Sequence, residues 1–197
     1  MSDGVDLGRR RFLGAATGVT SAIGIGFVAV PFLSSWKPSA RAQALGAPVE
    51  VDISKLDDGA LMRVEWRGKP IWVLKRTPAM IERVEQADPL VRDPMSEEPQ
   101  QPEYAAGRLR SIRPEVLVVI GSCTHLGCSP TPRFDAGAED LGGADWPGGF
   151  FCACHGSKFD LAGRVWRGVP APLNLVVPPH KYIDDATILV GEDEGVA

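Results

Sequence analysis

The chain has 197 residues, of which 44% are hydrophobic and 23% are charged, values close to the globular average that exclude wholesale disorder. This length allows one ordinary domain with an appendage and excludes a large multidomain enzyme. The formal net charge is −4, and an acidic chain without a basic patch is not expected to bind nucleic acid. The 22 glycines and 17 prolines favour short strands and loops over a helical bundle.

The N-terminal residues combine an export motif with a hydrophobic segment. Residues 9–13 (R-R-R-F-L) resemble the twin-arginine export signal of bacteria. Residues 12–36 carry no charged side chain, and a helix of that length extends roughly 37 Å, enough to cross a membrane core of about 30 Å. The arginines place residues 1–11 in the cytoplasm. The sequence therefore predicts a single transmembrane anchor at 12–36.

Two features bear on whether this anchor is cleaved. The triplets A-R-A and A-Q-A within 40–44 are acceptable to a signal peptidase, although the apolar segment is longer than a usual signal. Small residues also recur at every fourth position, where another transmembrane helix can approach closely: Gly14, Gly18, Ala22 and Gly26. We therefore favour an uncleaved anchor. Residues 37–48 (KPSARAQALGAP) predict a flexible hinge, which leaves a periplasmic domain at 49–197.

The pattern of this domain predicts mainly strands. Apolar and polar residues alternate over 62–66, which is typical of a half-buried strand. A turn at 67–70 then leads into a second strand at 71–74 and forms a hairpin. Continuous apolar runs predict further strands at 116–120 and 187–190.

One helix and one irregular segment interrupt these strands. Thr77 and Pro78 are a good N-cap and first residue for a short helix ending near Gln86. Residues 88–110 are rich in proline and charge and predict an excursion on the surface. His180, within P-P-H-K, is expected to be a surface or turn residue.

Two short segments contain all four cysteines and two of the three histidines. They read C-T-H-L-G-C at 123–128 and C-A-C-H-G-S at 152–157. Each follows a strand-like run and contains a glycine, which allows the backbone to approach a buried object. We expect these runs to be neighbouring strands, whose ends bring two thiolates and two imidazoles to one point.

Four kinds of site are compatible with this composition. A structural zinc site usually spaces its ligands as C-x₂₋₄-C and H-x₃₋₅-H, whereas cysteine and histidine alternate within each segment of this chain. Two structural disulfides leave both histidines without a role. A Cys–His nucleophile pair needs neither the duplication nor the additional cysteines. A [2Fe–2S] cluster with two cysteines on one iron and two histidines on the other accounts for every residue type.

The two segments resemble the motif of the Rieske iron–sulfur family. The resemblance implies that Cys123 and Cys152 bind the inner iron, and that His125 and His155 bind the outer, solvent-facing iron. It also implies a disulfide between the remaining cysteines, Cys128 and Cys154, which ties the two loops together in the quinol-oxidising branch of the family. A disulfide suits an exported protein.

The family resemblance extends beyond the cluster motif. Residues 163–175 (GRVWRGVPAPLNL) are similar to the proline-rich loop that covers the cluster from a third side, so cluster-binding loops are expected over about 121–175. Residues 1–48 are similar to the anchor and hinge of the iron–sulfur subunit of ubiquinol–cytochrome c reductase. The fold implied is an antiparallel β-sandwich with a cluster-binding subdomain at one tip.

The resemblance also implies roles for individual side chains. His155 is the ligand whose outer nitrogen meets the quinol, Leu126 shields the cluster, and Ser157 donates a hydrogen bond to a bridging sulfide. Many members of the family carry a tyrosine two residues after this serine, where the chain has Phe159. Neutral imidazoles make the cluster less negative than four thiolates do, which raises its potential to roughly −150 to +300 mV and suits quinol oxidation.

The function implied is that of an electron-transfer subunit in the bacterial inner membrane. It would accept an electron and a proton from ubiquinol at cytochrome b and pass the electron to the c-type cytochrome subunit of a dimeric complex. The chain alone is not a complete enzyme, because it has no C-x-x-C-H haem attachment motif. The alternative is the Rieske small subunit of a periplasmic molybdenum oxidase, which also uses twin-arginine export.

Overall fold

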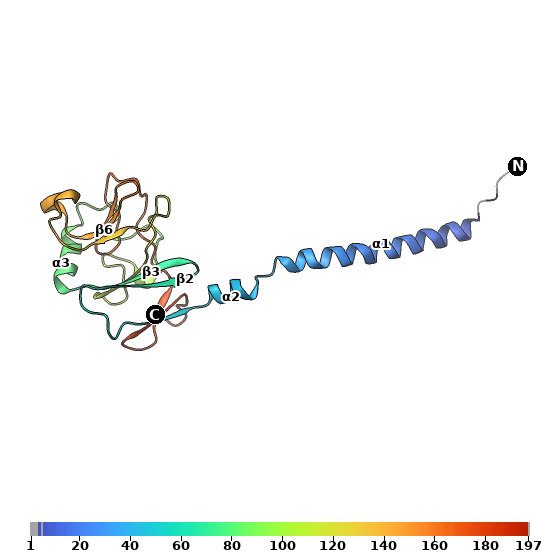
Figure 1. Cartoon of the computed structure of the whole chain (residues 1–197), viewed down its shortest axis with the longest axis horizontal. Helices are drawn as coiled ribbons and strands as arrows, with labels where there is room; N and C mark the ends of the chain where they lie inside the picture. Colours follow the sequence, from blue (N-terminus) through green and yellow to red (C-terminus); the bar gives the residue numbers. More distant parts are fainter. Residues whose placement is uncertain (1–3, 5, 197) are drawn as a thin grey trace. The chain divides into compact units, whose positions relative to one another are not determined.

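A computed structural model describes residue 4 and residues 6–196 of the chain (Figure 1). Residues 1–3 and 5 of the predicted cytoplasmic segment 1–11 lie outside the described residues. The chain divides into two compact units, Met1–Ala44 and Leu45–Ala197, and each unit is described by itself.

The first unit consists mainly of the long helix α1, Leu7–Ser35. Its N-cap is Asp6, whose carboxylate accepts hydrogen bonds from the Gly8 and Arg9 amides. The helix therefore begins five residues before the uncharged segment and includes the arginine motif. By length and composition, it is apolar enough to cross a membrane.

A second helix, α2, spans Ala40–Gly46 within the predicted hinge. The Ser39 hydroxyl accepts a hydrogen bond from the Ala42 amide at its start, as an N-cap does. Alanine has the highest helix propensity of the amino acids, and this segment contains three alanines. The predicted hinge at 37–48 therefore contains one short helix.

The second unit is built around a three-stranded antiparallel sheet in the order β2-β3-β4. The strands are β2, Leu61–Trp66, β3, Lys69–Lys75, and β4, Val116–Ile120. Arg67 and Gly68 both have positive φ, 53° and 72°, in the turn that joins β2 to β3, as a type I′ hairpin requires. The predicted hairpin is confirmed.

Both faces of this central sheet are covered, because alternate side chains of a strand point to opposite faces. Ile71 and Val73 of β3 pack into one apolar cluster with Ile188 of the C-terminal sheet. Trp72 and Leu74, the neighbouring residues of β3, pack into a second cluster that contains Phe150, Phe159 and both free cysteines. The uninterrupted apolar runs in β3 and β4 are the sequence signature of this two-sided burial.

Two further antiparallel sheets complete the unit, in the orders β1-β9-β8 and β5-β6-β7. The first contains β1, Val49–Asp52, β9, Thr187–Val190, and β8, His180–Tyr182. The second contains β5, Thr131–Arg133, β6, Gly149–Cys152, and β7, Ser157–Phe159. The structure is therefore mainly β, as expected.

The helical elements of this unit are short. Helix α3, Pro78–Gln86, has Thr77 as its N-cap, as predicted from the sequence. Three 3₁₀ turns lie in the longer loops: η1, Glu103–Ala105, η2, Glu139–Leu141, and η3, Gly143–Asp145.

Three expectations differ from the structure. Strands β4 and β6, which precede the two cysteine segments, belong to different sheets and are not neighbours in one sheet. The expected surface excursion at 88–110 contributes fully buried residues, among them Val91, Ala105 and Arg110. His180 is only 1% exposed, because its ring packs edge-on against Tyr104 and its Nδ1 hydrogen-bonds the Pro178 carbonyl.

Candidate metal centre

The first loop of the site, residues 121–130, follows the buried strand β4. The Cys123 amide donates to the Cys128 carbonyl at 2.7 Å, and the Gly127 amide donates to the Cys123 carbonyl at 2.9 Å. Gly127 has a φ of 82°, which glycine adopts without strain. These bonds close the loop tightly, so that Cys123 is buried while Leu126 at the tip is 70% exposed.

The second loop, residues 153–156, joins β6 to β7. Cys152 and Ser157 are paired in the hairpin, and the Gly156 amide donates to the Cys152 carbonyl at 2.9 Å. Gly156 has a φ of 79°, so this loop also turns on a glycine. Cys152 is buried at the strand end, and His155 is exposed at the tip.

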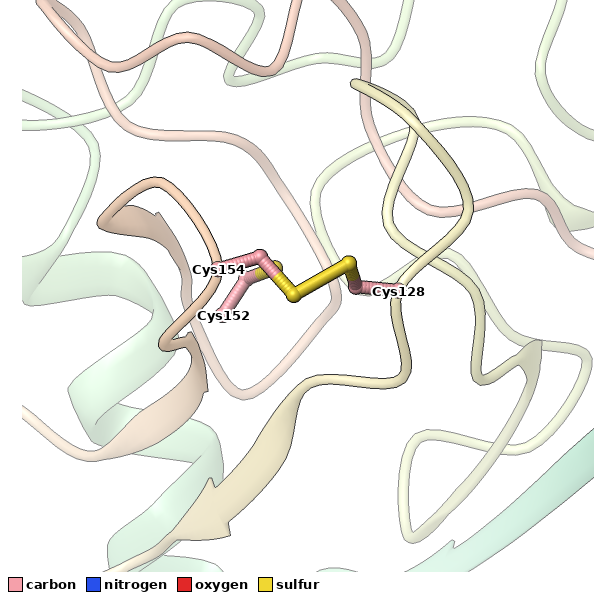
Figure 2. Close-up of side chains that lie close together, drawn as sticks. All are labelled: Cys128, Cys152 and Cys154. Atoms are coloured by element: carbon pink, nitrogen blue, oxygen red, sulfur yellow. A yellow bond between two sulfur atoms is a disulfide. The ribbon is translucent and has the colours of Figure 1, made fainter.

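A disulfide between Cys128 and Cys154 joins the two loops, with the Cα atoms 6.7 Å apart (Figure 2). The sulfur of Cys152 lies close by, and the three sulfurs are within 4.8 Å of one another. Because Cys128 and Cys154 are bonded to each other, they have no thiolate to offer a metal. The predicted disulfide is confirmed.

The two free cysteines lie together beneath the loops. Cys123 and Cys152 are 3% and 1% exposed, and their side chains are within hydrogen-bonding reach. Burial raises the pKa of the Cys152 thiol, and the adjacent Cys123 raises it further. A metal cation placed between them would reverse this effect, because a coordinated thiol loses its proton.

The two histidines form a second pair nearer the surface. The rings of His125 and His155 have centroids 4.7 Å apart and are nearly perpendicular, at 88°. Nδ1 of His125 is buried and has no hydrogen-bond partner among the described residues. A buried polar atom without a partner is costly. A nitrogen that binds a metal has no such partner when the metal is absent, so this atom is a candidate ligand.

A third segment, residues 160–177, hydrogen-bonds to the first loop and to the start of β7, the strand that follows the second loop. The Thr124 hydroxyl donates to the Leu173 carbonyl at 2.6 Å, and the Ala171 amide donates to Ser157 Oγ at 3.0 Å. Ser157 is fully buried, and its own hydroxyl proton is left to donate elsewhere. Sequence reasoning assigned no role to Thr124, although it is the one hydroxyl residue between Cys123 and Cys128.

Gly121 allows β4 to meet the first loop. A β-carbon at this position would overlap the ring of Trp72, which stacks on Phe150 with centroids 5.0 Å apart. The indole therefore packs directly against the backbone that enters the loop. This contact was not predicted, because a glycine in a strand end indicates a close approach without indicating by which residue.

The donor set fits a [2Fe–2S] cluster. The site offers two adjacent buried thiols and two adjacent imidazoles, and Nδ1 of His125, which has no partner among the described residues, is available for ligation. This composition is the Cys₂His₂ set of mixed-ligand iron–sulfur centres.

Two family models match the sequence. Residues 49–179 match the "Rieske [2Fe-2S] domain", and residues 1–39 match the "Ubiquitinol-cytochrome C reductase Fe-S subunit TAT signal". The second match covers the arginine motif and the whole of α1.

A solved structure titled "Hyperthermophilic respiratory Complex III" aligns over 89% of this chain and 98% of that chain, with 24% identity and a TM-score of 0.46.

Curated relatives match along the whole chain. The chain is 44% identical to the ubiquinol–cytochrome c reductase iron–sulfur subunit of Blastochloris viridis, covering 96% of each. It is 60% identical to the corresponding subunit of Allochromatium vinosum, covering 100% of this chain and 94% of the relative. The chain therefore belongs to the family of Rieske [2Fe–2S] iron–sulfur subunits of ubiquinol–cytochrome c reductase.

Proposed function

We propose that Cys123 and Cys152 bind the inner iron of the cluster and that His125 and His155 bind the outer iron. This proposal rests on two side-chain pairs, one of cysteines and one of histidines. Each pair has one member from segment 123–128 and one from segment 152–157. The difference in burial agrees with an inner and an outer iron, since both thiols are buried while His155 is exposed. Nδ1 of His125, which is buried without a hydrogen-bond partner among the described residues, would be its ligating atom.

The residues around these ligands support the cluster in different ways. Ser157 accepts a hydrogen bond from the Ala171 amide and keeps its own proton to donate to a bridging sulfide. Leu126 projects from the loop tip with 70% of its surface exposed, where it shields the cluster and contacts a partner. The Cys128–Cys154 disulfide keeps the two loops together.

The function that follows is electron transfer from ubiquinol. When bound, the cluster supplies a one-electron acceptor in the range of roughly −150 to +300 mV. His155 approaches the quinol because its ring is exposed at the loop tip. The ring nitrogen that does not face the metal accepts a hydrogen bond from the quinol hydroxyl and then its proton. Segment 160–177 excludes water from the other side of the site.

The partners and location follow from the family and from the N-terminal unit. The domain boundaries are a cytoplasmic segment at 1–11, an anchor at 12–36, a hinge at 37–48 and a periplasmic cluster domain at 49–197. The cluster domain exchanges electrons with cytochrome b and a c-type cytochrome in a dimeric complex of the bacterial inner membrane. Two family-model matches, at residues 1–39 and 49–179, support this arrangement.

The small Rieske subunit of a molybdenum oxidase is not favoured, because iron–sulfur subunits of ubiquinol–cytochrome c reductase match over the full length of the chain. Fractionation separates the two functions. The holo-protein should stay in the membrane after a high-salt wash and require detergent for release. Protease added to spheroplasts should digest the cluster domain, and protection of that domain would contradict a periplasmic location.

The ligand assignment is tested on the full chain, purified anaerobically in detergent. Wild type should contain two irons per chain, as a [2Fe–2S] domain requires. After reduction, its electron paramagnetic resonance (EPR) spectrum should have the low average g of a mixed histidine and cysteine cluster.

Histidine variants provide the control for this experiment. His125→Ala and His155→Ala should each lose the signal. The matched variant His180→Gln removes the one histidine outside the site and keeps a donor for the Pro178 carbonyl. It should retain the full signal. An unchanged spectrum in either alanine variant would overturn the assignment.

A further inference from the structure

Residues 88–111 carry no motif of the cluster site, yet they lie along segment 160–177. A bridge pairs Val91 with Trp166, in which the Arg92 amide donates to the Val165 carbonyl and the Arg167 amide donates to the Leu90 carbonyl, both at 2.9 Å. The Val177 amide donates to the Gln100 carbonyl at 2.9 Å. The two segments are therefore joined along most of their length.

Buried arginines supply most of the side-chain contacts between the two segments. Arg110 is fully buried and donates to the carbonyls of Ala162, Gly163 and Leu175, at 3.2, 3.3 and 2.6 Å. No carboxylate among the described residues forms an ion pair with it. Its remaining hydrogen bond goes to the side-chain oxygen of Gln101, at 3.1 Å. Arg110 therefore holds the backbone of segment 160–177 in place, since each of these bonds is charge-assisted.

Arg164 makes the reverse connection, from segment 160–177 to the other segment. It is fully buried, donates to Asp160 at 2.7 Å within its own loop, and donates to Asp88 and the Pro94 carbonyl at 2.7 and 2.8 Å. Asn174 accepts from the Val165 amide at 2.8 Å and donates to the Asp93 carbonyl at 3.4 Å.

One contact joins residues 88–111 to the part of segment 160–177 that hydrogen-bonds to the site. Nη1 of Arg92 donates to the Pro172 carbonyl at 2.9 Å. Pro172 lies between Ala171, which bonds to Ser157, and Leu173, which bonds to Thr124. A cavity of about 320 Å³ lies between the two segments at this place, lined by Arg92, Pro172 and Asn174 among others. Apolar packing is therefore incomplete there, and polar contacts must hold the loop.

We propose that residues 88–111 are a brace that fixes segment 160–177 against the two cluster loops, and that Arg92 is a positioning residue acting through the Pro172 carbonyl. The brace holds the Ala171 amide on Ser157 Oγ and so orients the hydroxyl that faces the cluster. This inference rests on the proposed function, because the position of Ser157 affects a potential only if the site holds the cluster.

The test compares two exposed arginines in the full-length holo-protein. Arg92→Ala removes the contact with Pro172. Arg167→Ala removes the same charge from a side chain that has no hydrogen bond or ion pair within the described residues. Hydrogen–deuterium exchange of a peptide covering 171–175 should be about tenfold faster in Arg92→Ala, which corresponds to ~1.4 kcal/mol, and unchanged in Arg167→Ala.

The midpoint potential separates a positioning role from a merely structural one. It is measured in 1 M salt, where the Debye length is about 3 Å and exposed charges are screened. Arg92→Ala should have a lower midpoint than wild type, because a less well oriented Ser157 stabilises the reduced state less, and Arg167→Ala should match wild type.

Each contrary outcome overturns a defined part of the inference. Wild-type exchange in Arg92→Ala, or equally fast exchange in both variants, would overturn the brace. Faster exchange with an unchanged midpoint would overturn the positioning role of Arg92. A wild-type protein without the mixed-ligand EPR signal would refute the proposed function, while the exchange comparison would still decide whether the brace exists.

Discussion

Phe159 lies in the same buried cluster as the two free cysteines and is fully buried. Many members of the Rieske family carry a tyrosine at this position, whose hydroxyl donates a hydrogen bond to the sulfur of a ligand cysteine. Such a bond stabilises the more negative, reduced state, so its absence lowers the potential. Phe159→Tyr should therefore raise the midpoint.

The size of this effect follows from hydrogen-bond energies. A bond to a charged group contributes about 1.5–3 kcal/mol, of which only the difference between redox states counts. Since ~59 mV corresponds to about 1.4 kcal/mol for one electron, we expect a rise of some tens of millivolts in a redox titration at one pH. An unchanged or lower midpoint would show that the added hydroxyl does not reach the sulfur.

His180 is buried in its neutral form, and this makes stability depend on pH. Burial lowers its pKa below the ordinary value of 6.5, although the hydrogen bond to the Pro178 carbonyl and the Asp193 carboxylate both raise it. Tyr104, whose ring packs on it, has a pKa raised by burial to about 12 and stays neutral. Because the unfolded chain binds a proton near pH 6.5 that the folded chain does not, the free energy of unfolding should fall as pH drops below about 6.5.

The variant His180→Gln isolates this contribution. Wild type should lose stability between pH 7.5 and pH 5, measured by denaturant unfolding of the holo-protein, and His180→Gln should lose less over the same interval. An equal loss in both proteins would assign the acid sensitivity to other groups.

At the scale of elements, the Cys128–Cys154 disulfide links a loop that follows the central sheet to a loop of the β5-β6-β7 sheet. It closes a loop of 26 residues, for which chain entropy predicts a stabilisation of about 3.5 kcal/mol. Cys128→Ser should therefore leave all four proposed ligands intact but accelerate loss of the cluster on mild heating, followed by visible absorbance. Wild-type cluster lifetime in this variant would contradict a stabilising role of the disulfide.

Elements whose sequence signals are local could be predicted closely. The start of α3 depends on Thr77 and Pro78, the hairpin on the alternation in β2, and β4 on its uninterrupted apolar run. The sequence also predicts that the cysteine and histidine segments form one site, because few kinds of metal centre use two cysteines and two histidines in this alternating order.

Features that depend on long-range partners could not be predicted. Arg110 and Arg164 look like surface residues in the sequence, and they are buried because carbonyls and carboxylates distant in the chain receive their hydrogen bonds. His180 is buried for the same reason, through Tyr104, which lies 76 residues earlier. The sequence does not predict helix α2, because its seven residues have no charge pattern or long apolar period and also fit a linker.

At the scale of the whole molecule, the connection between the two units bears on turnover. If the cluster domain moves between cytochrome b and a c-type cytochrome, residues 37–48 must allow that motion. Proline substitutions within 40–47 remove helical hydrogen bonds of α2 and restrict the backbone. In the assembled complex they should slow quinol oxidation while leaving the EPR spectrum unchanged. Unaltered turnover across several such variants would indicate that the motion does not depend on this segment.

The burial of both faces of β3 has a consequence for how the cluster domain comes apart. Alternate residues of β3 belong to two different apolar clusters. Disrupting either apolar cluster therefore displaces a strand on which the other apolar cluster also depends. Residues 45–197 should therefore unfold in a single cooperative transition. In that transition, the visible absorbance of the [2Fe–2S] cluster and the near-ultraviolet dichroism of the tryptophans should be lost together. A domain that loses its [2Fe–2S] cluster but keeps its tryptophan signal to a higher temperature would show that the two apolar clusters unfold separately.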